Sequence, residues 1–278
     1  MATLSAFADE AMDDFKSQID FLRLENINCI EIRFVNKKNV VELTCEELSE
    51  VKRILNENDV RVSAIASPIG KVRIDEPFGP HLDKFKHAVE IAHFLHAPFI
   101  RIFSYYPPEG KNIGSYRTEI LERMNKKVTL LKDSTIRIVH ENETDIYGST
   151  PENCVDLVRS VNSPQFRLAY DPANFVSGQK RTNSIEDCWP QMKPYVDHVH
   201  LKDWKLGSDH IGSMPGEGDA QIPELLADLA IMEYEGFLTI EPHLKSGGQF
   251  SGETGPELFS QAITRIRNLA LTADLSCG

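Results

Sequence analysis

Four residues of types that bind metal ions end four successive strand-like segments in the second half of the sequence. The four are Glu141, Asp171, His200 and Glu241. Consecutive members are separated by about one strand plus one helix, with a somewhat longer last interval. In a barrel of alternating parallel strands and helices, the carboxyl ends of the strands converge on one mouth. We therefore expect three carboxylates and one imidazole to meet there and hold one divalent cation, which is typical of an enzyme rather than a scaffold.

The oxygen-rich composition of this set bears on the choice of ion. Carboxylates with a single imidazole favour Mn²⁺, with Mg²⁺ and Co²⁺ as alternatives. Zn²⁺ in an open site is a further alternative. The competing interpretation is that the four side chains are separate polar groups at strand ends, each held in its own salt bridge. Four such residues in register favour the metal site.

Two members of the set, Glu141 and Glu241, come from predicted strands three apart around the barrel, so they would flank a bound molecule. A carboxylate pair about a metal-bound ketose is able to remove a proton from the carbon next to the carbonyl and to return one. The metal would polarise the carbonyl and stabilise the enediolate oxygen. The pair therefore predicts acid/base catalysis on a ketose or keto-polyol.

Short β-rich segments alternate with longer amphipathic segments along the chain. Strands are predicted at 4–8, 28–35, 60–67, 99–104, 135–142, 165–171, 195–202 and 237–241, and helices at about 11–25, 44–58, 81–96, 115–132, from 151, 184–193, 221–235 and 255–271. Eight βα units in order favour a closed parallel barrel over a doubly wound sheet, whose glycine-rich phosphate turn is missing after the first strand. We predict an α/β protein, a single (β/α)8 barrel domain over residues 1–278.

Alternation along the predicted strands places charged and aliphatic side chains on opposite faces. In the strands that end in the four candidate ligands, the face that carries the ligand is rich in polar groups, and the other face is largely aliphatic. Buried charges are costly unless they are paired or bind a metal. The polar face is therefore expected to look into the barrel and to form a site.

Lys202 shares this inward face with His200 and is a candidate for contacting an oxygen or a phosphate of the substrate. A salt bridge with Asp203 or Glu217 is the equally weighted alternative.

The irregular stretch 203–220 that follows is the longest in the sequence, and a long loop at a barrel mouth is often a lid or a binding loop.

Two other inward polar residues are candidates for contact with the substrate. His243 follows Glu241 at the same strand end, where it would support Glu241 in the site or be a plain polar group. Arg101 lies on the inward face of the fourth predicted strand, and an ion pair with Glu31 inside the barrel is favoured over substrate binding.

The overall composition limits the partners and the compartment. The 278 residues carry a net charge of −12 without a basic stripe, so the chain would repel a phosphate backbone and nucleic acid is not expected as a partner. Five cysteines are scattered without a C-x-x-C pair, which suits a reducing compartment. No apolar run approaches the roughly 20 residues of a membrane span, and the first residues lack a signal-peptide pattern. We expect a cytoplasmic protein without membrane contact.

Several short stretches resemble the xylose isomerase-like barrel superfamily of sugar epimerases, isomerases and inosose dehydratases. They are EIRF (31–34), VHENE (139–143), YDPANF (170–175), HVHLKDW (198–204), PGEGD (215–219) and TIEPH (239–243). Together with the strand spacing, the resemblance covers nearly the whole chain. By this resemblance Glu141, Asp171, His200 and Glu241 match the metal ligands of the family, and the two glutamates match the acid/base pair of its epimerases. The resemblance also permits a homo-oligomer.

One position departs from the pattern of the family. Many relatives carry a histidine three residues after the aspartate that ends the sixth strand, where this chain has Asn174. That histidine touches the substrate in ketose epimerases, so Asn174 is a candidate contact for a different substrate or binding mode. The abasic-site endonuclease branch needs this histidine and others for a three-zinc cluster, but this chain has Ser67 and Ser104 near the corresponding strand ends. A DNA-repair function is therefore disfavoured.

The sequence thus predicts a metal-dependent isomerase or epimerase that moves a proton next to the carbonyl of a ketose or keto-polyol. The first alternative is a dehydratase that eliminates water from a keto-polyol such as an inosose at the same metal site. The second alternative is a sugar-binding barrel without catalysis. A small sugar or polyol is the expected ligand, and the lack of a glycine-rich phosphate turn favours a non-phosphorylated one.

Overall fold

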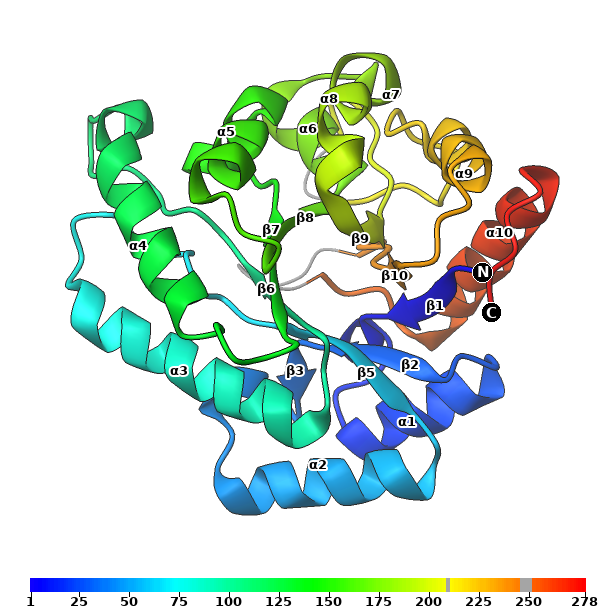
Figure 1. Cartoon of the computed structure of the whole chain (residues 1–278). Coiled ribbons are helices and arrows are strands. Elements are labelled where there is room, and N and C mark those ends of the chain that lie inside the picture. Colours follow the sequence, from blue (N-terminus) through cyan, green and yellow to red (C-terminus); the bar gives the residue numbers. More distant parts are fainter. Residues whose placement is uncertain (209–210, 246–251) are drawn as a thin grey trace.

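Eight parallel strands form the centre of the computed structural model, which describes residues 1–208, 211–245 and 252–278. The strands are β1 (Thr3–Ala6), β2 (Cys29–Ile32), β5 (Arg61–Ala66), β6 (Phe99–Ile102), β7 (Arg137–Glu141), β8 (Phe166–Tyr170), β9 (Val196–Leu201) and β10 (Phe237–Ile240). They pair in the order β1-β10-β9-β8-β7-β6-β5-β2, and the two outermost strands, β1 and β2, also lie side by side. The sheet therefore curls into a nearly closed barrel (Figure 1), and the predicted (β/α)8 fold is confirmed.

Helices connect the strands and surround the barrel (Figure 1). They are α1 (Phe15–Leu24), α2 (Cys45–Glu57), α3 (Phe78–Leu95), α4 (Arg117–Thr129), α5 (Pro151–Val161), α6 (Pro172–Gln179), α7 (Ser184–Asp187), α8 (Trp189–Met192), α9 (Ile222–Ile231) and α10 (Pro256–Thr272). The predicted start of α2 is confirmed, because the Thr44 hydroxyl accepts from the Glu47 N–H group while the Glu47 carboxylate accepts from the Thr44 N–H group. No helix within the described residues is long and apolar enough to cross a membrane.

The sequence does not predict helix α6 or the strands β3 and β4, which follow barrel strands. Helix α6 begins directly after β8, because the Asp171 carboxylate accepts from the N–H groups of Ala173 and Asn174 and so caps the helix. A two-stranded hairpin of β3 (Phe34–Val35) and β4 (Lys38–Asn39) follows β2, which therefore ends earlier than predicted. The hairpin turn depends on left-handed backbone, which hydrophobic periodicity does not reveal.

Aliphatic side chains of the strands pack outward against the helices. Ile30, Ile138 and Ile240 are at most 1% exposed and belong to one continuous core, and burial of each such side chain stabilises the fold by about 1.5–3 kcal/mol. A separate small cluster comprises Ala64, Phe99, Val139, Ala169 and the partly buried Phe237. Most of its members precede an inward polar residue by two positions on the same strand. The cluster therefore forms an apolar floor beneath the polar groups inside the barrel.

One lysine in the helix layer is fully buried. The Lys127 ammonium on α4 donates to the Tyr105 hydroxyl at 2.5 Å and lies over the ring of Phe78. Burial, reinforced by the neighbouring Arg123 guanidinium, lowers the pKa of Lys127 from 10.5 to about 7. The charged form of this lysine is therefore disfavoured in the folded protein.

A close approach in the same layer joins Gly148 to His140. A Cβ atom at Gly148 would lie 2.2 Å from Cε1 of His140, and the Gly148 N–H group donates to the Ser104 hydroxyl at 2.7 Å. His140 is fully buried and stacks with Phe166, and burial lowers its pKa to about 3. The neutral imidazole thus packs where only glycine leaves enough space.

Candidate metal centre

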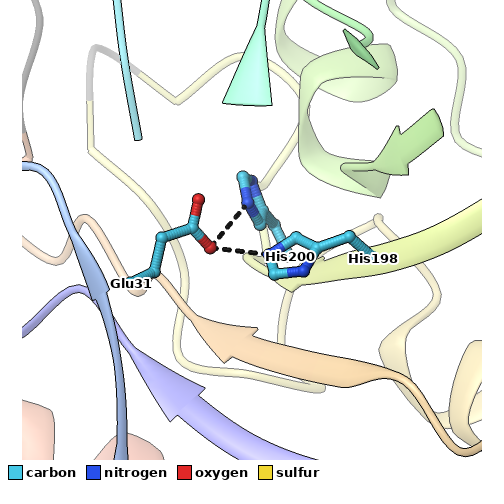
Figure 2. A group of neighbouring side chains, drawn as sticks. All are labelled: Glu31, His198 and His200. Atoms are coloured by element: carbon cyan, nitrogen blue, oxygen red, sulfur yellow. Dashed lines mark hydrogen bonds and ion pairs between the residues drawn. The ribbon is translucent and has the colours of Figure 1, made fainter. Parts of the chain in front are cut away.

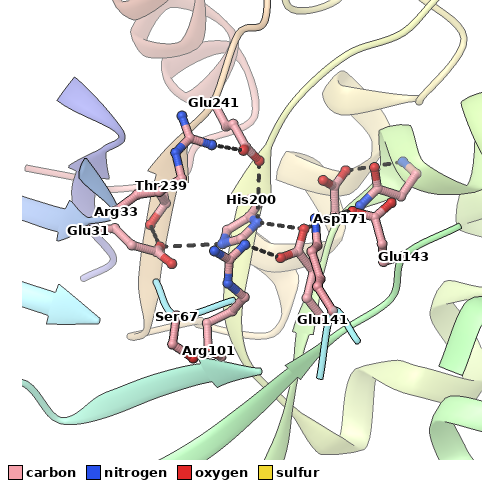
Figure 3. Close-up of polar contacts among 12 residues, drawn as sticks. Glu31, Arg33, Ser67, Arg101, Glu141, Glu143, Asp171, His200, Thr239 and Glu241 are labelled. Carbon is pink, nitrogen blue, oxygen red and sulfur yellow. Dashed lines mark hydrogen bonds and ion pairs between the residues drawn. The ribbon is translucent and has the colours of Figure 1, made fainter. Parts of the chain in front are cut away.

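The four predicted metal ligands meet at the carboxyl ends of four neighbouring strands (Figure 3). Glu141 ends β7, Asp171 follows β8, His200 lies on β9 and Glu241 follows β10. One ligand atom from each lies within 4.8 Å of those of the other three, and all four residues are buried. The expected convergence of these side chains is therefore present in the structure.

His200 lies between the two carboxylates that the sequence singles out as an acid/base pair. Its Nδ1 atom is 3.3 Å from Oε1 of Glu141 and 3.5 Å from Oε2 of Glu241. The other oxygen of each carboxylate accepts from an arginine: Arg101 donates to Glu141 at 2.6 Å, and Arg33 donates to Glu241 at 2.9 Å. Each carboxylate thus has one oxygen facing His200 and one held by a guanidinium (Figure 3).

The ion pair predicted between Arg101 and Glu31 is wrong. Arg101 pairs with Glu141, and Glu31 contacts His198 and His200 instead. The physical reason is the order of the strands. The strand of Arg101, β6, pairs directly with the strand of Glu141, whereas β5 separates β6 from β2.

Burial and neighbouring charges set the protonation of the two glutamates. Burial opposes ionisation of Glu141, but the charges of His200 and Arg101 outweigh it and hold the pKa of this carboxyl well below its usual range. Burial acts in the same direction on Glu241, and there the Lys202 ammonium is the largest of the charges that hold the pKa well below the usual range. Both carboxylates are therefore ionised at neutral pH, which is the form that accepts a proton or binds a metal ion.

Asp171 is positioned by the helix that it caps and by Asn142. Its Oδ1 atom accepts from the N–H groups of Ala173 and Asn174, and the Asn142 amide bonds the backbone N–H and C=O groups of Asp171. Oδ2 is the oxygen that remains, and the Lys202 ammonium lies 2.5 Å from it. Burial outweighs the attraction of Lys202 and raises the pKa of Asp171 to about 6. A further cation beside Oδ2 would favour the ionised form.

Lys202, a predicted substrate contact, lies against two of the ligands. It is 5% exposed, and its ammonium contacts Asp171 and lies 3.5 Å from Oε2 of Glu241. The weighed salt bridge with Asp203 or Glu217 is wrong, because Asp203 accepts backbone N–H groups and Glu217 lies 3.9 Å from an arginine of α10. The inward direction predicted from strand alternation is correct.

Asn174, the position at which the sequence departs from many relatives, lies beside Glu141. Its Nδ2 atom donates to Oε1 of Glu141 at 3.2 Å and to the Asn142 carbonyl at 2.9 Å. The residue is 7% exposed. Its amide therefore supports one carboxylate of the pair.

His243 lies at the rim of the cluster, with 22% of its side chain exposed. Its Nε2 atom is 3.1 Å from Oε1 of Glu10 and 3.2 Å from Oε1 of Glu241. Burial opposes protonation of the imidazole, but these two carboxylates outweigh it and raise the pKa of His243 to about 9. The predicted proximity of His243 to Glu241 is present, and the ring is protonated at neutral pH.

Sequence reasoning missed the residues that follow β1, although they complete the cluster. Glu10 contacts His243, and Asp9 accepts from Nε of Arg33 at 2.8 Å. The Phe7 ring lies 4.4 Å from the Arg33 guanidinium and packs edge-on against His200. The signal exists in the sequence, because Asp9 and Glu10 directly follow the strand predicted at 4–8. The strand-end rule that locates the four ligands also selects Asp9 and Glu10.

The charges and donors of this cluster fit a divalent cation. Ion pairs connect a group of carboxylates to a group of cations and to the ring of His200. The carboxylates are those of Asp9, Glu10, Glu31, Glu141, Asp171 and Glu241. The cations are those of Arg33, Arg101, Lys202 and His243.

Without a bound ion, burial opposes protonation of His200, but Glu141 and Glu31 outweigh it and raise the pKa of the ring well above its usual value. A metal ligand must be neutral, and with His200 neutral six carboxylates would face four cations, a difference that a divalent ion would balance. Both ring nitrogens of His200 and Oδ2 of Asp171 are buried and have only ion-pair contacts, with Glu31, Glu141 and Lys202 among others, and no hydrogen bond of good geometry in the described part of the chain. A bound cation would satisfy Nδ1 of His200 and Oδ2 of Asp171.

Asp203 organises the loop that follows β9. Its buried carboxylate accepts from the backbone N–H groups of Trp204, Gly216, Gly218 and Ala220. A Cβ atom at Gly218 would lie 2.1 Å from Oδ1 of Asp203, so glycine is required for this approach. One side chain therefore holds both ends of the predicted binding loop 203–220, of which 209–210 lie outside the described residues.

The fold and the cluster together define a (β/α)8 barrel with a candidate metal centre at its mouth. The sequence model of the family described as xylose isomerase-like TIM barrel matches residues 19–269. The chain therefore belongs to this family, and the resemblance drawn from the sequence motifs is confirmed. A comparison with curated protein sequences finds no match.

Solved structures with the same fold include an epimerase, a dehydratase and a magnesium complex. The D-psicose 3-epimerase of Clostridium cellulolyticum H10, solved with D-tagatose, has a TM-score of 0.75 at 13% identity over 99% of this chain and 100% of that one. The probable 3-DHS dehydratase of Bacillus anthracis has a TM-score of 0.76 at 13% identity, over 96% and 99%. A xylose isomerase-like TIM barrel protein from Mycobacterium smegmatis in complex with magnesium has a TM-score of 0.75 at 14% identity, over 98% and 97%. At these identities the likeness shows the fold.

Proposed function

We propose that this protein is an enzyme that uses one divalent cation to move a proton at the carbon next to the carbonyl of a sugar or polyol. The observation that carries the proposal is the meeting of Glu141, Asp171, His200 and Glu241 in one buried cluster. Membership of the xylose isomerase-like family supports it. Mn²⁺ is the ion that we expect, and the magnesium complex of the Mycobacterium smegmatis protein makes Mg²⁺ the first alternative, before Co²⁺ and Zn²⁺.

The arrangement of the two glutamates suits transfer of a proton between the faces of a sugar carbon. A bound cation would polarise the carbonyl of the substrate. Glu141 ends β7 and Glu241 follows β10, three strands away around the barrel. This separation supports a mechanism in which one carboxylate takes the α proton and the other returns a proton on the opposite face. Arg101 and Arg33 hold these carboxylates in place. The outcome is inversion of one stereocentre, or isomerisation when the proton returns to the neighbouring carbon.

The cationic groups at the mouth would bind the oxygens of the sugar. Lys202 and the protonated ring of His243 are hydrogen-bond donors next to the ligand carboxylates. We propose that both donate to substrate oxygens. On the side of Glu141, we propose that Asn174 contacts the substrate through its amide oxygen, which accepts from a hydroxyl, because its Nδ2 atom already donates to Glu141 and to the Asn142 carbonyl. Arg101 is committed to Glu141 at 2.6 Å, so we assign it the positioning of that carboxylate in place of the predicted substrate contact.

Elimination of water from a keto-polyol is the second candidate reaction, and His243 favours it. A protonated imidazole beside Glu241 is able to give a proton to a departing hydroxyl after the α proton has been removed. A sugar-binding barrel without catalysis is the remaining alternative. In each case we expect a small-molecule ligand, a cytoplasmic location, and no nucleic-acid or membrane partner. A homo-oligomer is compatible with each of these functions.

Deuterium exchange tests the proposed reaction directly. The Mn²⁺-loaded protein is incubated in D₂O with a panel of ketoses and keto-inositols, the ion is removed with EDTA, and the sugars are examined by NMR. We expect deuterium at the α carbon of at least one compound. The structure of the product then separates epimerase, isomerase and dehydratase.

Three variants make this test specific. Glu141→Gln and Glu241→Gln each remove one carboxylate of the pair and are expected to abolish exchange. Asp197→Asn is the matched control, because Asp197 is also a carboxylate paired with arginines, Arg137 and Arg167, and lies at the start of β9, away from the mouth. Exchange that survives in both glutamine variants, or no exchange on any compound with metal bound, would remove the support for the proposed chemistry.

A further inference from the structure

The two ring nitrogens of His200 face different groups. Nδ1 points at the ligand cluster, 3.3 Å from Glu141 and 3.5 Å from Glu241. Nε2 lies 3.3 Å from Oε2 of Glu31, on β2 (Figure 2). The ring therefore stands between the candidate metal ligands and a carboxylate that does not belong to them.

One oxygen of Glu31 gathers several donors inside the barrel. His198 lies 2.6 Å from Oε2 through its Nε2 atom, and the Thr239 hydroxyl donates to the same oxygen at 2.8 Å. Glu31, His198, His200 and Thr239 have no exposed surface. An ionised carboxylate buried this deeply needs donors, and here they gather on Oε2, whereas Oε1 has no hydrogen-bond partner among the described residues. Oε2 and its partners therefore hold one another in a single arrangement.

The apolar floor fixes this arrangement from below. The His198 ring packs against Phe99 and Phe237, with ring centroids 5.8 Å and 6.1 Å apart. Thr239 and His200 are register partners on β10 and β9, so the hydroxyl and the imidazole reach Glu31 from neighbouring strands. Glu31 has no room to turn toward water, and its oxygen remains opposite Nε2 of His200.

We propose that Glu31 is a positioning residue that keeps the proton of His200 on Nε2 and so presents Nδ1 to the divalent cation. This inference rests on the proposed function, because it assigns the orientation of one of the ligands of that ion. A carboxylate that accepts from the distal nitrogen of a ligand histidine fixes the tautomer and the ring plane and makes the ligand more basic. The bonds of Thr239 and His198 to Oε2 of Glu31 keep this oxygen facing His200.

A second cation among Glu31, His198 and His200 is the competing interpretation, since these residues also form a compact group of ligand types. The distances argue against it. The contacts of His198 and Thr239 with Oε2 of Glu31, at 2.6 Å and 2.8 Å, are hydrogen-bond lengths. Both donors share the oxygen that also faces His200, so a metal ion there would have to displace all of these bonds.

Metal affinity tests the role of Glu31. Titration calorimetry with Mn²⁺ measures the Kd and the number of ions per chain for the wild type, Glu31→Gln, Thr239→Val and the control Asp197→Asn, at a temperature at which each is folded. We expect one ion per chain and a Kd that rises about 10–100-fold in Glu31→Gln. A smaller rise is expected in Thr239→Val, because this change removes one support of Glu31 and leaves its charge. The Kd of Asp197→Asn should equal that of the wild type.

The tautomer of His200 is a second measurement, which would not change if Glu31 only stabilised the fold. In Mg²⁺-loaded protein labelled with ¹⁵N-histidine, NMR should find the His200 proton on Nε2, and this proton should exchange faster with water in Glu31→Gln. An unchanged Kd in Glu31→Gln or a proton on Nδ1 would overturn the inference and leave the proposed reaction to the deuterium-exchange test. Two ions per chain would overturn the inference together with the single-ion part of the proposed function. A wild-type protein that binds no divalent ion would overturn both.

Discussion

The buried ammonium of Lys127 leads us to expect a defined change of stability with pH. Its pKa falls from 10.5 to about 7 on folding, which corresponds to roughly 5 kcal/mol at full effect. Below pH 7 both the folded and the unfolded state carry the proton, so the whole cost acts. Between pH 7 and 10.5 the unfolded state binds more protons, so stability rises with pH. Above pH 10.5 neither state is charged and the cost disappears.

The replacement Lys127→Met isolates this effect, because methionine fills similar space without a charge. The change leaves the Tyr105 hydroxyl without its donor, which costs about 1–3 kcal/mol at every pH. The diagnostic quantity is therefore the difference between wild type and variant at two pH values. From pH 6 to pH 9 we expect the wild type to gain about 2–3 kcal/mol relative to Lys127→Met.

Urea denaturation at pH 6 and pH 9 measures the free energies of unfolding. Lys126→Met is the matched control, because Lys126 is the exposed neighbour on the same helix. Its difference from the wild type should be the same at both pH values. Parallel curves of stability against pH for the wild type and Lys127→Met would refute the reasoning, since they would mean that Lys127 keeps its usual pKa in the folded protein.

Three other perturbations have definite outcomes. Gly148→Ala should lower the free energy of unfolding by about 1–3 kcal/mol, because the added Cβ overlaps with His140. In the control Gly79→Ala the Cβ meets nothing within 4 Å, so thermal unfolding should occur at the same or a slightly higher temperature. Equal effects of the two changes would contradict the packing argument. Arg101→Met should raise the pKa of Glu141, so the exchange rate should fall at least tenfold and the acid limb of its pH profile should move to higher pH; an unmoved limb would count against the ion pair. Removal of divalent ions with EDTA should lower the thermal midpoint, and Mn²⁺ should restore it in proportion to the logarithm of its concentration.

The positions of the four ligands could be predicted from the sequence because one geometric rule covers them. Parallel strands of a barrel end at the same mouth, so Glu141, Asp171, His200 and Glu241 need only be found at strand ends. Strand alternation also gives the inward direction of Lys202. Local rules of this kind need no knowledge of which strands are neighbours.

The partners of these residues could not be predicted in the same way, because they depend on long-range pairing. The sequence places both Arg101 and Glu31 on the inward face, but only the strand order decides that Arg101 meets Glu141. A register shift between Ile30 and Glu31 in the pairing of β2 with β5 adds to the difficulty. Helix α6 is not predicted because its first turn is capped by Asp171, a residue interpreted from the sequence only as a metal ligand.

The backbone bonds of Asp203 have a consequence for the thermodynamics of binding. Ordering a loop costs about 1–2 kcal/mol per residue in conformational entropy, and in this protein the carboxylate of Asp203 already orders the stretch from Gly216 to Ala220 during folding. A ligand that enters the mouth then meets a preorganised wall there. Its association should therefore show a small entropic penalty from this part of the loop, and more of the contact energy should be expressed as affinity.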